Sequence, residues 1–331
     1  MTDSKEVAED GQVKRERLAM LQNTESSLYY QHLIPNRLYK SIQADDDRIY
    51  GGRFTTAGNY YYCSSQNSVL LFDTSDPYNF KHKATIPGWN IHWTISDMDV
   101  DSKEQLLLYT SLDQHIRLVN LSLEGRQEIL DSAARNPGEE PRGGSGVLSA
   151  KFAGDGKEIV CGNRSGEIMV YDLVSNRVTT RVSRSHDDDI NSVCFSNRQH
   201  SNIFLSGSDD TFVKVWDRRS LAGNRPVGVF VGHAEGITNV CSKGDGLHVA
   251  SNSKDQLLKV WDIRKMNSFH EYRSVTPPKR TPNFDYRYNE RYRMTERQPK
   301  HESDRSLFTF KGHQVYQTLI RCQFSPLETT G

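Results

Sequence analysis

Part of the sequence recurs at a fixed interval. The stretch Leu205–Arg219 (LSGSDDTFVKVWDRR) aligns without a gap with Ala250–Arg264 (ASNSKDQLLKVWDIR), 45 residues further along. Weaker copies end at Asp73, Asn120 and Asp172, and successive copies are 45 to 52 residues apart. A period near 45 residues is typical of repeats that each form a four-stranded blade. The sequence therefore predicts a series of similar sheets.

The repeats carry the alternation of β-strands. In the strongest copy, Val213 and Val215 point to one side while Lys214 and Trp216 point to the other. Asp-Gly pairs such as Asp155-Gly156 lie where one strand has to reverse into the next, and this dipeptide favours a tight hairpin. We therefore expect an all-β protein.

The composition excludes several classes of protein. Lysine plus arginine and aspartate plus glutamate both total 42, so no overall charge attracts a nucleic acid or a membrane surface. No stretch reaches the roughly 18 apolar residues of a membrane span, and the N-terminus is too polar for a secretory signal. The five cysteines are far apart in the sequence, which argues against a disulfide framework or a thiolate metal site. We expect a soluble intracellular protein that needs no metal or cofactor.

Three features recur together: Gly-His before a repeat, Asp in a turn and Trp-Asp at a strand end. Gly232-His233 and Gly312-His313 supply the first of these in the last repeats. The pattern resembles WD40 repeats over roughly residues 38–331, which implies a β-propeller. The aligned positions predict two buried polar networks, structural rather than catalytic, because a buried carboxylate needs several hydrogen bonds. The networks would comprise His186, Ser206, Asp210 and Trp216 in one blade, and His233, Ser251, Asp255 and Trp261 in the next.

The propeller implied in this way is incomplete. The family usually closes about seven blades, whereas this sequence holds about five full repeats and the start of a sixth at Ser306–Phe310 and Leu319–Pro326. We therefore expect a truncated or partial product, whose first outer strand at Leu38–Ile42 lacks the final blade that it would join. Before the repeats, we expect a disordered tail over residues 1–12 and a short helical segment over residues 13–37.

Both strong repeats end in an aspartate followed two positions later by arginine. The pairs are Asp217 with Arg219 and Asp262 with Arg264. They resemble the W-D-x-R box of substrate receptors for cullin-4 RING ubiquitin ligases, which dock on an adaptor called damaged-DNA-binding protein 1. We expect both arginines on one rim of adjacent blades, where each guanidinium offers a partner a rigid fork of donors. The alternative is that each arginine only forms an ion pair with the aspartate of its own blade.

A longer series of segments resembles one receptor type. HDDDINSVCF, SGSDDTFVKVWDRR, KGDG and SNSKDQLLKVWDIRK occur in the order found in the cullin-4-associated factor 11 family, also called WD-repeat protein 23. The resemblance implies a non-catalytic receptor of the nucleus and cytoplasm that presents an unknown protein substrate for ubiquitination and proteasomal degradation. The alternative is a generic WD40 scaffold in chromatin or RNA processing. An enzyme is the least expected reading, since a catalytic triad would need a nucleophile in a cleft beside the histidines.

A basic and aromatic insert spans about residues 265–305. From Arg264 to Arg305 there are 11 Lys or Arg against six Asp or Glu. Interleaved arginine and tyrosine can stack on single-stranded bases or bind an acidic peptide, although we favour a solvated loop partly folded onto the rim. Candidate contact residues for a substrate or nucleic acid are Tyr286, Arg287, Tyr288, Arg291 and Arg293.

Overall fold

The computed structural model describes residues 41–43, 48–76, 78–91, 93–121, 127–131, 145–276, 285–288 and 300–324. All of its strands lie in one compact unit, Asp47–Leu327, whereas residues 41–43 belong to a separate unit. The expected N-terminal tail (residues 1–12) and helical segment (residues 13–37) lie outside the described residues. None of the helices within the described ranges is long and apolar enough to cross a membrane.

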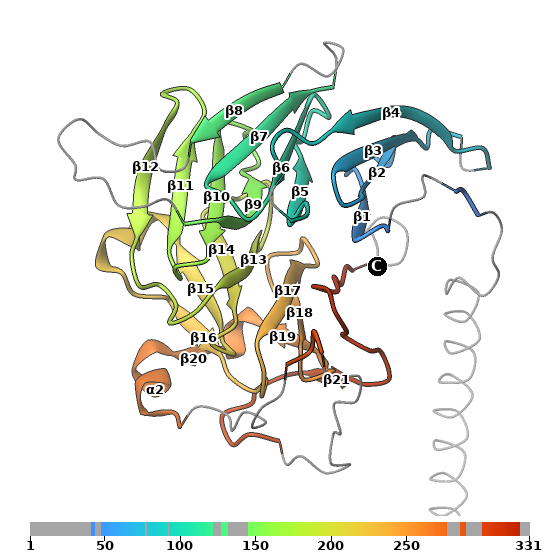
Figure 1. The fold of residues 1–331 in the computed structure, drawn as a ribbon. Coiled ribbons are helices and arrows are strands. Elements are labelled where there is room, and N and C mark those ends of the chain that lie inside the picture. Colours follow the sequence, from blue (N-terminus) through green and yellow to red (C-terminus); the bar gives the residue numbers. More distant parts are fainter. Residues whose placement is uncertain are drawn as a thin grey trace, which may run out of the picture. The chain divides into compact units, whose positions relative to one another are not determined.

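In the described part of the chain, five antiparallel sheets follow one another, and we number them blades one to five (Figure 1). Blade one contains β1 (Gly51–Phe54), β2 (Tyr60–Ser64), β3 (Ser68–Asp73) and β4 (Lys81–Pro87). Blade two contains β5 (Asp97–Val100), β6 (Leu106–Thr110), β7 (His115–Asn120) and β8 (Gln127–Asp131). Blade three contains β9 (Val147–Phe152), β10 (Glu158–Asn163), β11 (Ile168–Asp172) and β12 (Arg177–Val182).

The last two blades carry the strongest repeats. Blade four contains β13 (Ile190–Phe195), β14 (Ile203–Ser208), β15 (Val213–Asp217) and β16 (Gly228–Phe230). Blade five contains β17 (Ile237–Ser242), β18 (His248–Ser253), β19 (Leu258–Asp262) and β21 (Phe308–Phe310). The predicted all-β propeller of about five full four-stranded repeats is therefore confirmed.

Adjacent blades pack through shared apolar cores. Leu205 and Val215 of blade four form one core cluster with Val240 and Trp261 of blade five. The two blades approach closely at Gly207, where a Cβ atom would lie 2.5 Å from Cγ2 of Val240. Glycine is thus required at this position for the blades to pack. In β15 the alternation does not separate an exposed face from a buried one, because Val213–Trp216 is buried throughout.

The start of the sixth repeat is divided between a strand and an extended segment. β21 pairs with β19 and completes blade five, in agreement with the strand expected at Ser306–Phe310. Leu319–Phe324, which we call the sixth-repeat segment, carries no strand, and Pro326 lies outside the described residues. The outer strand expected at Leu38–Ile42 is not formed at Ser41 and Ile42, and the rest of that stretch is not described.

The insert differs from the expected solvated loop over its first part. A turn of 3-10 helix, η2 (Ile263–Lys265), leads into β20 (Asn267–Ser268) and α2 (Phe269–Ser274). β20 pairs with β16 and adds a fifth strand to blade four. A capping box at Ser268 starts the helix. Local capping and the free edge of β16 therefore order the start of a stretch that was expected to be a loop partly folded onto the rim.

Candidate docking site

Two chains of buried hydrogen bonds join the turns of blades four and five to their strands. In blade four, His186 Nδ1 lies 2.7 Å from Asp210 Oδ2 and His186 Nε2 lies 2.6 Å from Ser206 Oγ. Trp216 Nε1 donates to the same Ser206 Oγ at 2.8 Å. All four side chains are buried. The structure thus connects the four residues that the repeat spacing placed in one network.

Blade five repeats this arrangement with its own four residues. His233 Nδ1 lies 3.0 Å from Asp255 Oδ2, and His233 Nε2 lies 2.7 Å from Ser251 Oγ. Trp261 Nε1 donates to Ser251 Oγ at 2.8 Å. The second predicted set is therefore joined in the same order, and each aspartate also accepts backbone N–H groups of its turn.

Burial and pairing set the protonation states in blade four. Burial lowers the pKa of His186 below its ordinary value, despite the nearby carboxylate of Asp210. Burial also raises the pKa of Asp210, but the interactions with His186 and Lys214 outweigh it and lower that pKa to about 2. The ionised Asp210 accepts Nδ1–H of a neutral His186, so Nε2 is an acceptor and takes the Ser206 O–H, while Ser206 Oγ accepts from Trp216 Nε1. A neutral histidine satisfies every one of these bonds.

Blade two pairs its turn aspartate with an arginine of its third strand, whereas blades four and five pair theirs with a histidine that precedes the first strand. Arg117 is fully buried in β7 and binds Asp113 through Nη1 at 2.7 Å and through Nη2. Its Nε also donates to the Trp89 carbonyl at 3.0 Å. Sequence analysis did not find this pair, although Asp113 precedes Arg117 by four residues just as Asp210 precedes Lys214. That shared spacing was the signal available.

The two predicted docking arginines form matching forks with their own aspartates. Arg219 donates from Nε to Asp217 Oδ1 at 2.9 Å and from Nη2 to Oδ2 at 2.6 Å. Arg264 does the same with Asp262 at 3.0 and 2.8 Å. Each carboxylate also accepts the backbone N–H of its arginine. The intrablade ion pairs that we considered as the alternative are therefore present.

Pairing does not bury these guanidinium groups. The Arg219 side chain is 71% exposed and that of Arg264 is 66% exposed, although their aspartates are largely covered. The pairs use Nε and Nη2, so Nη1 remains available as a donor on the outer side. The hydrogen bonds from Arg264 lower the pKa of Asp262 to about 2, so that pair stays ionised at neutral pH. A fixed and exposed fork costs less entropy to bind than a mobile side chain.

Both forks lie at the same end of neighbouring blades. Arg219 follows the end of β15 in η1 (Arg218–Gly223), and Arg264 follows the end of β19 in η2. Arg218, the residue before Arg219, has a different role: its guanidinium binds Glu158 of blade three. Blades four and five thus each present one fork arginine to solvent at this end.

The basic and aromatic insert contains a third fork with the same geometry. Arg287 donates from Nε to Asp285 Oδ1 at 3.0 Å and from Nη2 to Oδ2 at 2.7 Å. Arg287 is 59% exposed, and its guanidinium lies 5.6 Å from the ring centre of Tyr288, which is itself 77% exposed. Sequence analysis named Arg287 without noticing that Asp285-Tyr-Arg287 repeats the spacing of Asp217-Arg-Arg219. Arg291 and Arg293 lie outside the described residues.

This third fork sits at the opposite end of the strands. Tyr286 lies beneath Lys254, whose Nζ is 4.6 Å from the ring centre, and Lys254 is paired with Asp209 at 2.7 Å. Asp209 and Lys254 precede β15 and β19, whereas Arg219 and Arg264 follow those strands. Burial raises the pKa of Tyr286 to about 12. The structure therefore separates the candidate contact residues of the insert from the two arginines after Trp-Asp.

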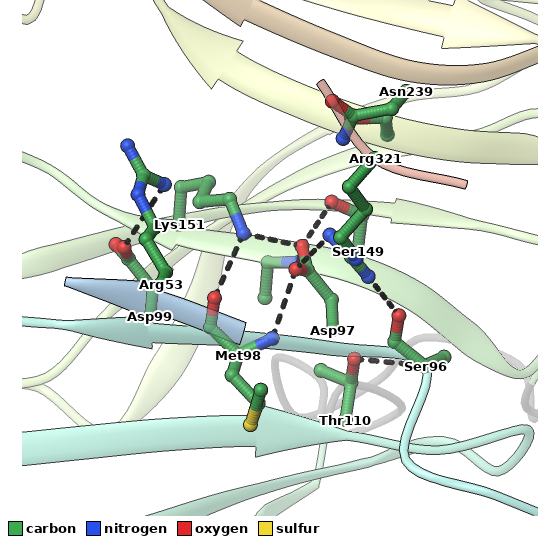
Figure 2. Close-up of polar contacts among 12 residues, drawn as sticks. Arg53, Ser96, Asp97, Met98, Asp99, Thr110, Ser149, Lys151, Asn239 and Arg321 are labelled. Atoms are coloured by element: carbon green, nitrogen blue, oxygen red, sulfur yellow. Dashed lines mark hydrogen bonds and ion pairs between the residues drawn. The ribbon is translucent and has the colours of Figure 1, made fainter. Parts of the chain in front are cut away.

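A buried cluster of charges connects the inner strands (Figure 2). Asp97 of β5 accepts from Lys151 of β9 at 2.6 Å and from Arg321 of the sixth-repeat segment at 2.6 Å. Burial raises the pKa of Asp97, but Arg321 and Lys151 outweigh it and lower the pKa to about 2. Asp99 lies 3.9 Å from Arg53 and also binds Arg198. No motif pointed to this cluster, because its members come from four separate blades and the sixth-repeat segment.

The described residues offer few groups for chemistry. His186 and His233 each contact a serine hydroxyl and an aspartate, but Ser206 and Ser251 are fully buried and their hydroxyl oxygens also accept the tryptophan N–H of the blade. Among the described residues, no group of three or more His, Cys, Asp or Glu side chains is arranged to hold a metal ion. The paired guanidinium forks are exposed, and they suit contact with a macromolecule.

Comparison with protein families gives two matches. Residues 55–231 match the family described as nucleolar protein 10-like, N-terminal domain, whose model is a β-propeller. Residues 224–262 match the WD domain, G-beta repeat. The second match contains β19, the strand of blade five that carries Trp261.

Several curated proteins are similar over most of the chain. The LEC14B protein of Lithospermum erythrorhizon is 38% identical over 291 residues, which are 86% of this chain and 60% of that protein. The DDB1- and CUL4-associated factor 11 homologues of Caenorhabditis elegans and Caenorhabditis briggsae are 36% and 35% identical, over 72% and 71% of this chain and 42% of each relative. The chain thus spans about 60% of the length of the first relative and 42% of the nematode ones. It belongs to the nucleolar protein 10-like β-propeller family and, among WD40-repeat proteins, is a homologue of the DDB1- and CUL4-associated factor 11 proteins.

Proposed function

We propose that this chain is a substrate receptor that docks on the damaged-DNA-binding protein 1 adaptor of a cullin-4 ubiquitin ligase. The observation that carries the proposal is the pair of exposed, aspartate-held guanidinium forks at Arg219 and Arg264. The names of the nematode relatives associate those proteins with the same adaptor and cullin. Asp217 and Asp262 would hold the arginine side chains in the orientation that the adaptor binds. Their carboxylates would also balance the positive charge of the arginines at the interface.

The receptor would act without catalytic groups of its own. It would hold a protein substrate near the ligase, which raises the effective concentration of substrate lysines at the conjugating enzyme. The burial of the His186 and His233 networks supports a role without catalysis, because both histidines hold the turns of their own blades in place. The resemblance further implies that the protein works in the nucleus and the cytoplasm, and that its substrate is marked for proteasomal degradation.

The docking proposal is tested by reversing both charges at once. The double variant Arg219→Glu, Arg264→Glu should lose co-purification with the adaptor and cullin-4. Interface hot spots are worth about 2 kcal/mol each, so two of them together correspond to roughly a thousandfold loss of affinity. Because the side chains are exposed, the free energy of unfolding should change by no more than about 1 kcal/mol.

Two controls keep the result interpretable. Arg184→Glu reverses an exposed arginine beyond β12 that belongs to neither fork, and should bind the adaptor as the parent does. Arg219→Gln with Arg264→Gln removes the forks without placing two acids beside Asp217 and Asp262. Full recovery of the adaptor with both double variants would refute the docking role of these arginines.

A second candidate function rests on the insert. Arg287 and Tyr288 form an exposed stacked pair, an arrangement that can bind unpaired bases. A scaffold that works in RNA processing would lose bound RNA when Arg287 and Tyr288 are replaced by alanine, while Arg219→Gln with Arg264→Gln would retain it. A dependence of that binding on salt would indicate phosphate contacts.

A further inference from the structure

The sixth-repeat segment (Leu319–Phe324) bridges the last blade to the first two. It has no strand ladder and is held mainly by side chains. On the blade-five side, the Cys322 N–H donates to Asn239 Oδ1 at 3.1 Å, and the Ile320 carbonyl accepts from Thr238 Oγ1 and Asn252 Nδ2, both at 3.1 Å. A segment held in this way opens more readily than a blade that is paired along its strands.

The other side of the segment reaches blades one and two. Arg321 donates to Asp97 Oδ1 at 2.6 Å and to the Ser96 carbonyl, as Figure 2 shows. Gln323 Nε2 donates to the Gly52 carbonyl at 3.3 Å. The segment therefore joins parts of the chain that are distant in sequence, and anything that fixes it to blade five fixes this connection as well.

Two thiols meet where the segment lies on β17. Cys241 Sγ of β17 and Cys322 Sγ are 3.7 Å apart, and both are free. A disulfide bond is about 2.05 Å long, so the sulfur atoms have to approach by about 1.7 Å. Side-chain rotation and a small shift of the segment, which has no strand partner, can supply that movement. The cysteines come from positions 81 residues apart, so a bond between them would close a long loop.

The surroundings favour the first oxidation at Cys241 over Cys63, Cys161 and Cys194. The hydrogen bond with Cys322 lowers the pKa of the Cys241 thiol below its ordinary value, whereas burial raises the pKa of Cys63, Cys161 and Cys194. The thiolate is the form that reacts with peroxides. Cys322 is half-buried and provides the route from solvent to its buried partner.

We propose that Cys241 and Cys322 are a redox modification site, at which hydrogen peroxide forms a reversible disulfide that locks the sixth-repeat segment onto blade five. The Cys241 thiolate attacks one peroxide oxygen, the O–O bond breaks, and hydroxide leaves and takes up a proton. The resulting sulfenic acid is attacked by the Cys322 sulfur, the S–S bond forms, the S–O bond breaks, and water leaves. Two thiols thus lose two electrons and two protons, and one peroxide becomes two waters. Cellular dithiols reverse the reaction.

The experiment treats the purified full chain with one equivalent of hydrogen peroxide under native conditions, then alkylates and digests it without reduction. We expect one linked peptide pair containing Cys241 and Cys322, two hydrogen atoms lighter than the sum of the free peptides and lost after dithiothreitol. Cys194→Ser should leave the linked pair unchanged. Cys322→Ser should replace it with a sulfenic acid trapped by dimedone at Cys241.

A second readout tests the lock itself. Limited proteolysis after Arg321 should slow at least tenfold on oxidation in the parent, and should not change in Cys322→Ser. A link from Cys241 to Cys194, or dimedone labelling of Cys241 in the parent with no link to Cys322, would overturn the proposal. If oxidation links the two cysteines but does not slow cleavage after Arg321, the proposal that the disulfide locks the segment onto blade five is refuted.

Discussion

Replacing Ser206 with alanine tests whether the blade-four network stabilises the fold. Ser206 Oγ accepts from Trp216 Nε1 at 2.8 Å and contacts His186 Nε2 at 2.6 Å. Both partners are buried within the blade, so neither can turn to bulk water when the hydroxyl is removed. The substitution therefore leaves one donor and one acceptor without a partner.

The expected cost follows from these two groups. A buried polar group that loses its partner costs about 1 to 3 kcal/mol. Two of them give about 2 to 6 kcal/mol, and we expect about 3 kcal/mol because small shifts recover part of the loss. This is a large share of the roughly 5 to 15 kcal/mol by which a domain is stable. Ser251→Ala should cost a similar amount, because Ser251 makes the same two contacts in blade five.

Urea unfolding monitored by tryptophan fluorescence and circular dichroism measures the effect. Ser220→Ala is the control, since Ser220 is exposed, and it should change the free energy of unfolding by less than about 0.5 kcal/mol. Trp216→Phe should cost less in the Ser206→Ala background than in the parent, because the indole N–H is already unpaired there. A cost below about 0.5 kcal/mol for Ser206→Ala, or strictly additive effects in the cycle, would refute the network argument.

Two further predictions concern buried charge. Asp97→Asn should destabilise the protein by about 3 to 5 kcal/mol, because Lys151 then stays buried without a carboxylate; urea midpoints measure this, and an unchanged midpoint would exclude it. Acidification from pH 7.5 to 5.5 should also lower stability. Burial holds the pKa of His186 below that of the unfolded chain, near 6.5, so the unfolded state takes up a proton that the folded state resists, with a slope of at most about 1.4 kcal/mol per pH unit. His186→Gln should reduce the dependence of the free energy of unfolding on pH. An equal slope in that variant would show that a group other than His186 causes the dependence.

The repeat made much of the fold predictable. The interval of ten residues between Ser206 and Trp216, repeated between Ser251 and Trp261, places a hydroxyl and an indole on paired strands, and both pairs are joined in the structure. These networks recur at matching positions of each repeat, so the repeat and the WD40 resemblance together suffice to predict them. The two Asp-x-Arg forks could also be predicted from the sequence, because each fork forms within three consecutive residues.

Other features depend on contacts that no local pattern encodes. Asp97, Lys151 and Arg321 come from distant positions, and their meeting depends on how the blades are arranged around one another. Likewise, the insert was expected to be a loop partly folded onto the rim, whereas the free edge of β16 recruits Asn267–Ser268 as a strand. The charge of a segment indicates its preference for water. It does not show which neighbouring strand edge can form hydrogen bonds with that segment.

The link between Arg321 and Asp97 spans 224 residues of chain, and it bears on how the protein is synthesised. Each blade from one to five draws its first three strands from consecutive sequence, so these hairpins can form in turn as the chain leaves the ribosome. Asp97 and Lys151, by contrast, emerge long before their last cationic partner. In a nascent chain Asp97 therefore lacks one of its two cationic hydrogen-bond donors until residue 321 has been translated.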